Sequence, residues 1–158
     1  MLLEEQIGEE LRKRKLTIAV AESCTGGLLG SRLTDVAGSS EYFLGGVIAY
    51  QNEVKESVLR VPHKVIAAHG AVSSETAEAM ASGCRDLFKC DIAVSITGIA
   101  GPGGGTAEKP VGLTYIGLAT SRGVISRRFR WEGSRMQNKE SSVRAAIEMI
   151  LSALKLEA

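Results

Sequence analysis

Hydrophobic residues recur along the chain with different spacings, and these spacings predict the order of helices and strands. Apolar side chains at every fourth position from Leu3 onward, set among charges, predict an amphipathic helix over residues 2–14. The short, mainly apolar run Thr17–Ala21 predicts a buried strand. Apolar positions three and four apart begin again at Leu28 and predict a second helix, which the segment starting at Gly38 ends.

The middle of the chain continues with shorter elements. Residues 43–50 are mostly apolar and contain two glycines, which predicts a strand with a bulge or a close backbone approach. Asn52 is a favourable helix cap, and the apolar positions behind it predict a short helix that ends before Pro62. Pro62 suits the first turn of another short helix, which ends at Gly70. A longer amphipathic helix follows Ser73.

The last third of the chain predicts a central strand, a hairpin and a final helix. Ile92–Ile96 is almost wholly apolar, as expected for a strand covered on both faces. A glycine-rich loop over 97–106 leads to two strands, 111–120 and 124–131, joined as a hairpin. Apolar positions over 143–154 form one face of the last helix. This order predicts an α/β fold, a single-domain three-layer α/β/α sandwich with a mixed, largely parallel sheet.

Length and composition narrow the class of protein. The 158 residues suit one domain, 1–158, with a substantial core. A net charge of +1 gives no global electrostatic support for a nucleic-acid partner. No apolar run approaches the ~18 residues that a membrane span needs, and the N-terminus lacks the order of a secretion signal. The three cysteines, Cys24, Cys84 and Cys90, cannot all pair, which favours a reducing, cytoplasmic location.

Three segments that follow predicted strands are candidates for a site. They are the turn 22–27, the segment 50–55 and the glycine loop 97–105. In α/β proteins, ligands bind outside the carboxyl ends of parallel strands. If the three strands run parallel, we expect these segments to meet at one edge of the sheet.

The first turn offers two adjacent nucleophiles, Ser23 and Cys24. Serine needs a base, and Lys55, one turn into the helix after the second strand, can act as one if burial or nearby positive charge lowers its pKa. Tyr50 ends that strand and could relay a proton to the pair. A single Ser, Tyr or Lys is more often a surface or capping group, and a buried cysteine is usually inert. Because Cys24 has no evident histidine partner, we rank it below Ser23.

Other polar groups have weaker claims to chemistry. His63 and His69 have no Cys or His neighbour at a metal-ligand spacing and lie outside the three segments, so we expect no metal site. The glycine loop matches neither common nucleotide-binding motif, and it reads equally well as an anion cradle or as a flexible connection. Arg135 follows a turn that leads into the last helix, where a phosphate could dock.

The second strand of the hairpin predicts a sheet edge. Strand alternation puts Arg128 and Arg130 on one face, and Ile125, Phe129 and Trp131 on the other. Arginines of this kind are typical of a solvated edge strand. The aromatic residues also make the edge a candidate surface for self-association, and we expect a homodimer.

Taken together, several motifs resemble the CinA C-terminal domain family of nicotinamide-nucleotide amidohydrolases. The matching segments cover nearly the whole chain in the family's order, and together they are far more specific than any one alone. They are Ala21-Glu-Ser-Cys-Thr-Gly-Gly27, Tyr50-x-Asn52-x-x-Lys55, His69-Gly-Ala-Val-Ser73, Ser95-Ile-Thr-Gly-Ile-Ala-Gly-Pro-Gly-Gly104 and Glu108-Lys-Pro-Val-Gly112.

The resemblance implies hydrolysis of nicotinamide mononucleotide to nicotinic acid mononucleotide and ammonia, within pyridine-nucleotide recycling. It implies Ser23 as nucleophile, Lys55 as general base and Tyr50 as its partner, with no metal or organic cofactor. Backbone N–H groups near the two glycines of the first turn are expected to hold the oxyanion. Candidate substrate-binding residues are Thr25, Gly26, Gly27, Thr97, Gly98, Gly101, Gly104 and Arg135.

The chain departs from the family's pattern in one segment. The family often reads Gly-Asp-Arg, followed after a few residues by a second basic residue. Here Ser134 replaces the acidic residue, and Lys139 stands where the second arginine is expected. Many relatives also carry a larger N-terminal domain. This chain begins shortly before its first predicted strand, so it resembles the stand-alone form. Two alternatives stay open: a nucleotide-binding or partner-binding domain without activity, and a cysteine-dependent hydrolase using Cys24.

Overall fold

The chain folds into one five-stranded sheet with helices on both faces, in a computed structural model that describes residues 1–156. The strands are β1 (Ile18–Glu22), β2 (Phe43–Ile48), β3 (Ile92–Gly98), β4 (Leu113–Thr120) and β5 (Gly123–Arg130). The helices are α1 (Leu3–Arg14), α2 (Leu28–Thr34), α3 (Asn52–Ser57), α4 (His63–His69), α5 (Ser74–Phe88) and α6 (Arg135–Leu156), with a 3-10 turn, η1, at Ser39–Glu41.

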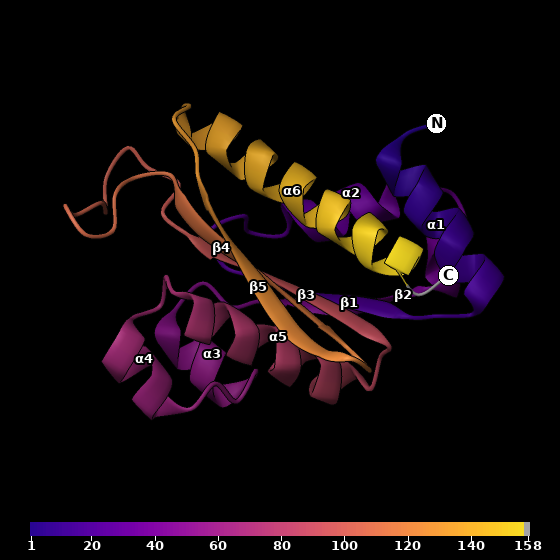
Figure 1. Cartoon of the computed structure of the whole chain (residues 1–158), viewed down its shortest axis with the longest axis horizontal. Helices are drawn as coiled ribbons and strands as arrows, with labels where there is room; N and C mark the ends of the chain where they lie inside the picture. Colours follow the sequence, from indigo (N-terminus) through magenta and orange to yellow (C-terminus); the bar gives the residue numbers. More distant parts are fainter. Residues whose placement is uncertain (157–158) are drawn as a thin grey trace.

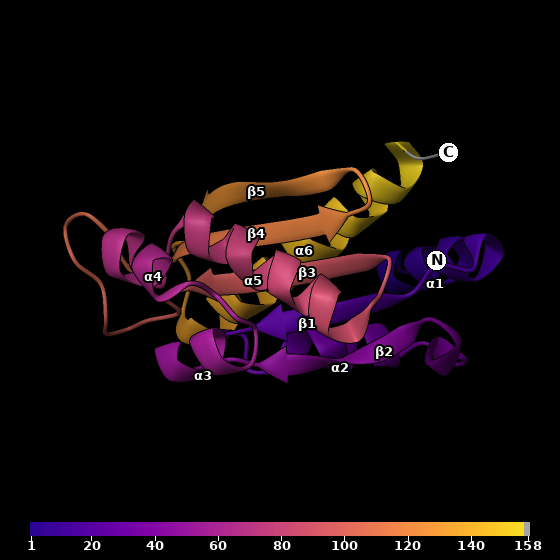
Figure 2. The same ribbon diagram turned by 90° about the horizontal axis from the view of Figure 1, so that it is seen from below.

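The strand order β2-β1-β3-β4-β5 makes the sheet mixed. β1 pairs in parallel with both β2 and β3, whereas β4 runs antiparallel to β3 and β5. Four strands therefore point the same way and only β4 is reversed. Helices α1, α2 and α6 cover one face, and α3, α4 and α5 cover the other (Figures 1 and 2). This arrangement confirms the three-layer α/β/α sandwich that the hydrophobic pattern predicts.

The two faces of the sheet carry side chains of different size. In β1, Ile18 and Val20 join the core beneath α1, α2 and α6, whereas Ala19 and Ala21 lie beneath α5. Small residues on the second face let α5 approach the sheet closely. At Gly117 in β4, an added Cβ would lie 2.4 Å from the α5 backbone. A larger side chain there would push helix and sheet apart.

The end of β2 and the packing of two aromatic residues differ from the expectations. The strand predicted over 43–50 ends at Ile48, so Tyr50 lies in the connection to α3. The rings of Phe129 and Trp131 stack 5.2 Å apart and pack, partly buried, against the α6 side of the core. Trp131 Nε1 donates to Ser142 Oγ on α6 at 3.0 Å. The aromatic pair thus packs within the chain, and it offers a smaller surface for self-association than the sequence suggests.

Within the described part of the chain, no helix combines the length and the apolar character needed to cross a bilayer.

Candidate active site

A buried lysine meets the serine of the first turn. Lys55 lies on α3, and its side chain is 1% exposed. Its Nζ lies 3.1 Å from Ser23 Oγ and 3.2 Å from the carbonyl oxygen of Tyr50. The pairing follows from the parallel sheet, because β1 and β2 lie side by side and both end at this edge. The structure therefore brings together the candidate nucleophile, Ser23, and the candidate base, Lys55.

Burial changes the pKa of this lysine. Removal from water disfavours the charged amine and lowers the pKa of Lys55, while the neighbouring Cys24 acts in the opposite direction. A protonated Lys55 donates to Ser23 Oγ. Once neutral, the same contact lets the serine hydroxyl donate to Nζ, as a general base requires.

The turn that carries Ser23 is anchored by Glu22, a residue to which the sequence motifs assign no role. Its carboxylate is 1% exposed. It accepts hydrogen bonds from Thr25 Oγ1 at 2.6 Å and from the N–H groups of Leu29 and Gly30 at 2.9 Å. These two N–H groups belong to the first turn of α2, where a carboxylate is favoured. The available signal was an acidic residue at a strand end, directly before a helix N-terminus.

Three residues expected near the oxyanion do not line the cavity beside Ser23. Thr25 is 1% exposed and its hydroxyl is bound to Glu22. The N–H of Gly26 donates to the carbonyl of Ser23 at 3.1 Å, which closes the turn. Gly26 and Gly27 both have positive φ, 59° and 106°, so glycine is needed here for the turn itself. The placement of Thr25, Gly26 and Gly27 thus differs from the expectation.

Tyr50 also contributes in a different way from that expected. Its side chain is 55% exposed, and its hydroxyl accepts from Arg135 Nη2 at 3.1 Å rather than contacting Ser23 or Lys55. Only its backbone carbonyl reaches Lys55 Nζ. Tyr50 continues the alternation of β2, in which Leu44 and Ile48 are also exposed, so its phenol lies on the outward side.

The Ser23–Lys55 pair opens into a cavity of 270 Å³, here called the pocket. Of the expected substrate-binding residues, Thr97, Gly98, Gly101, Gly104 and Arg135 line it. Its other lining residues are Ser23, Cys24, Tyr50, Asn52, Lys55, Ala71, Val72, Ile99, Ala100 and Gly103.

The glycine loop is held in shape around this pocket. Thr97 Oγ1 donates to the carbonyl of Ala71 at 2.8 Å. Gly101 has φ +87°, and an added Cβ would lie 2.4 Å from Val111 Cγ1. In the hydrogen-bond network of the described residues, the N–H groups of Ala100, Gly101 and Gly104 have no protein acceptor. A held loop with free N–H groups favours the anion cradle over the flexible connection.

Cys24 lines the same pocket, but its thiol is poorly suited to attack. Burial raises its pKa to about 11, so almost no thiolate exists near neutral pH. If the chain hydrolyses amides as the resemblance implies, we expect Cys24→Ala to stay within about threefold of the unchanged protein, because a protonated thiol is a weak nucleophile. Steady-state ammonia release measures this. A loss beyond about a hundredfold in the folded variant would instead favour the cysteine-dependent alternative.

The two histidines lie outside the pocket. His63 Nδ1 is 2.9 Å from Glu56, and His69 Nδ1 is 3.4 Å from Glu75, both at exposed positions. Among the described residues, no group of three or more His, Cys, Asp or Glu side chains is placed to hold a metal ion.

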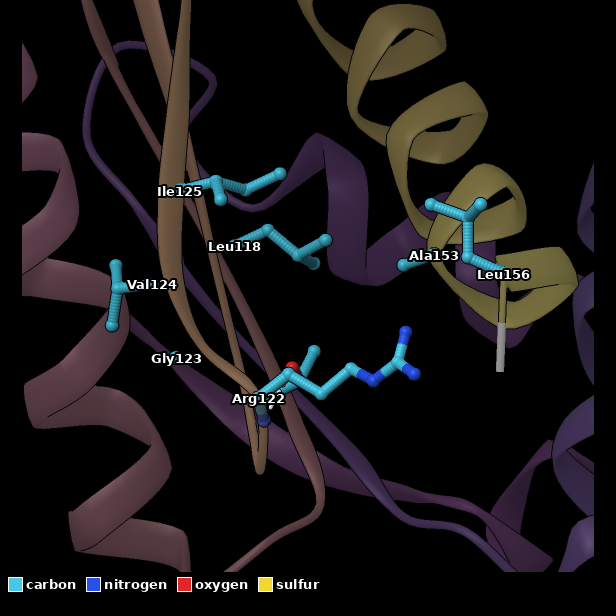
Figure 3. Close-up of a pocket in the computed structure, with 8 residues that line it drawn as sticks. Leu118, Arg122, Gly123, Val124, Ile125, Ala153 and Leu156 are labelled. Carbon is cyan, nitrogen blue, oxygen red and sulfur yellow. Dashed lines mark hydrogen bonds between the residues drawn. The ribbon is translucent and has the colours of Figure 1, made fainter.

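A second hollow of 290 Å³ lies between the β4–β5 hairpin and the end of α6 (Figure 3). Leu118, Ile125, Ala153 and Leu156 make it mainly apolar, and Arg122 is the only ionisable residue among the described residues that line it. The hollow lacks a nucleophile–base pair.

Fold and site together define a single-domain α/β protein with a buried serine–lysine pair at the carboxyl edge of its parallel strands. Comparison with known proteins gives the family. The model of the CinA C-terminal domain matches residues 2–154, and the chain belongs to this family.

Relatives and solved structures agree with this assignment. A CinA-like protein from Chloroherpeton thalassium is 52% identical over 98% of this chain, which spans 38% of that relative's length. The crystal structure of competence/damage inducible protein CihA from Agrobacterium tumefaciens superposes with a TM-score of 0.93 at 40% identity, covering 97% of this chain and 93% of that one. A CinA superfamily protein from Klebsiella pneumoniae gives the same TM-score at 31% identity, covering 97% and 96%.

Proposed function

We propose that this chain hydrolyses the carboxamide of nicotinamide mononucleotide, giving nicotinic acid mononucleotide and ammonia. The observation that carries the proposal is the 3.1 Å contact between Ser23 Oγ and the buried Nζ of Lys55, whose pKa is lowered by burial. A serine beside a neutral amine is an activated nucleophile, suited to acyl transfer. The choice of substrate comes from the family resemblance carried by the segments around Ser23, Tyr50 and Lys55.

In the first half of the reaction, neutral Lys55 accepts the hydroxyl proton of Ser23 as Oγ attacks the carboxamide carbon. The carbonyl oxygen takes the electron pair. When the tetrahedral intermediate collapses, the C–N bond breaks and protonated Lys55 gives its proton to the departing nitrogen. Ammonia leaves, and an ester links the nicotinoyl group to Ser23.

In the second half, water enters the place that ammonia has left. Lys55, neutral again, accepts a proton from the water as the water oxygen attacks the ester carbon. Collapse returns Oγ and the proton to Ser23 and releases the carboxylic acid. One amide bond breaks, one water is consumed, and no redox change occurs.

The rest of the pocket suits an anionic nucleotide. The guanidinium of Arg135 lines it, and the free N–H groups of Ala100, Gly101 and Gly104 can meet phosphate or carbonyl oxygens. A nucleotide needs such donors at the end remote from the carboxamide. This chemistry would place the chain in pyridine-nucleotide recycling.

The test is ammonia release from nicotinamide, its riboside and its mononucleotide. We expect the mononucleotide to have a kcat/KM about 10–100 times that of the riboside, because charge-assisted hydrogen bonds to phosphate contribute roughly 1.5–3 kcal/mol. Thermal stabilisation by the mononucleotide without ammonia release would contradict the proposal and favour the binding domain without activity. Equal rates on riboside and mononucleotide would contradict the phosphate contacts.

A further inference from the structure

The first turn of α6 contains a buried amide that joins two separate segments at the pocket. Asn138 is 2% exposed. Its Oδ1 accepts from the N–H of Gly133 at 2.9 Å, and its Nδ2 donates to the carbonyl of Ala100 at 3.0 Å. The two partners fix the orientation of the amide group. The Gly133 N–H needs an acceptor, which is the amide oxygen, and the Ala100 carbonyl needs a donor, which is the amide nitrogen. The side chain therefore connects the turn before α6 with the glycine loop.

Arg135 makes a second connection to the same loop. Its Nη1 donates to the carbonyl of Gly101 at 2.7 Å, directly after the carbonyl held by Asn138. Its Nη2 donates to the Tyr50 hydroxyl. Two successive loop carbonyls are thus bound from α6, one by a buried amide and one by a guanidinium on the pocket wall.

From this geometry we infer that Asn138 is a positioning residue that sets where the glycine loop and Arg135 stand relative to the Ser23–Lys55 pair. Asn138 does not line the pocket, so it acts through Ala100 and through the turn at Gly133 that leads to Arg135. The nucleophile and base sit on other elements, the β1–α2 turn and α3. Asn138 therefore controls substrate affinity at the phosphate end and leaves the chemical step unchanged. The link to affinity rests on the proposed function.

Asn138→Asp tests this with almost no change of shape. The carboxylate still accepts from Gly133, but it sets an oxygen against the Ala100 carbonyl, which repels it. We expect KM for the mononucleotide to rise about tenfold while kcat stays within about twofold, since one lost buried hydrogen bond corresponds to roughly 5–100-fold in an equilibrium. KM for the riboside should change little. Asn138→Ser is the second variant if the Asp variant does not fold, because serine adds no charge and is too short to hold both partners. It should also raise KM for the mononucleotide and leave kcat nearly unchanged.

Ser142→Ala is the matched control. Ser142 is equally buried, lies one turn further along α6 and bonds to Asn138 only through the backbone carbonyl. The control should lose some thermal stability and keep its KM. An equal rise of KM in Ser142→Ala would assign the effect to α6 packing and overturn the inference.

Hydrogen exchange measured on peptides covering residues 98–105 provides a readout that needs no turnover. The protected amide in this stretch is the Ile99 N–H, which donates to the carbonyl of Leu113 at 2.9 Å. We expect it to exchange about tenfold faster in Asn138→Asp or Asn138→Ser than in the unchanged protein and in Ser142→Ala. Unchanged exchange in the folded variants would overturn the inference. Faster exchange with unchanged KM would overturn the link to affinity. If the unchanged protein releases no ammonia, the proposed function fails separately, and exchange alone decides whether Asn138 holds the loop.

Discussion

Replacing Ser23 by alanine should abolish ammonia release from nicotinamide mononucleotide while the fold is retained. Without Oγ no acyl-enzyme forms, and loss of the serine nucleophile costs about 10⁶-fold in kcat in a serine protease. The backbone of the turn should hold, because the Ser23 N–H donates to the Ile96 carbonyl at 2.9 Å and Glu22 anchors the helix start. The measurements are ammonia release at saturating substrate and the thermal midpoint.

Ser31→Ala provides the matched control, since Ser31 lies on the exposed side of α2 and outside the pocket. It should match the unchanged protein in rate and midpoint. Stoichiometric or near-normal ammonia release from folded Ser23→Ala would contradict the acyl-enzyme and point to direct attack by water. Retained binding of the mononucleotide by the inactive variant would separate the loss of chemistry from a loss of affinity.

The Ser23–Lys55 pair could be predicted because it depends on topology. Both residues follow apolar strands, and parallel strands deliver their carboxyl ends to one edge of the sheet. Once the hydrophobic pattern predicts the strands, the meeting of the two segments follows with little further information. The same reasoning places the glycine loop at that edge, because it follows β3.

Asn138 could not be predicted, because its side-chain partners are backbone groups that no side-chain pattern reveals. Glu22 left one signal, its place directly before a helix N-terminus, but two of its three partners are also backbone groups. The Ala100 carbonyl that Asn138 holds is 38 residues away in the sequence. Local periodicity shows that a position is buried, but not which distant carbonyl or N–H it meets. The Tyr50 hydroxyl meets Arg135 and not the Ser23–Lys55 pair for a related reason, because Arg135 lies 85 residues further along the chain.

Replacing Lys55 by methionine and by arginine should separate its catalytic role from its effect on stability. Neither methionine nor the permanently charged guanidinium can accept the Ser23 proton, so both variants should lose about 10³-fold or more in kcat. The two variants should differ in their free energy of unfolding. Arginine keeps a charge in a site that is 1% exposed and cannot shed its proton, so Lys55→Arg should be clearly less stable than Lys55→Met.

The pH dependence of the unchanged protein follows from the same burial. Because the folded pKa of Lys55 lies below the ordinary lysine value near 10.5, the charged amine destabilises the fold at lower pH. As pH rises through the lowered pKa towards 10.5, the folded protein releases its proton before the unfolded chain does, and the contribution of Lys55 to stability increases. Activity should rise over the lower part of that range, where neutral Lys55 forms.

Urea unfolding at a series of pH values tests this linkage together with the rate profile. Lys55→Met should lack the component of the stability slope that belongs to Lys55, while the slopes due to other groups remain. If the rate of the unchanged protein does not depend on pH below 10.5 and Lys55→Met keeps the same stability slope, Lys55 is not a titrating base. Ser23 would then need another proton acceptor, and the contact at 3.1 Å would only orient its hydroxyl.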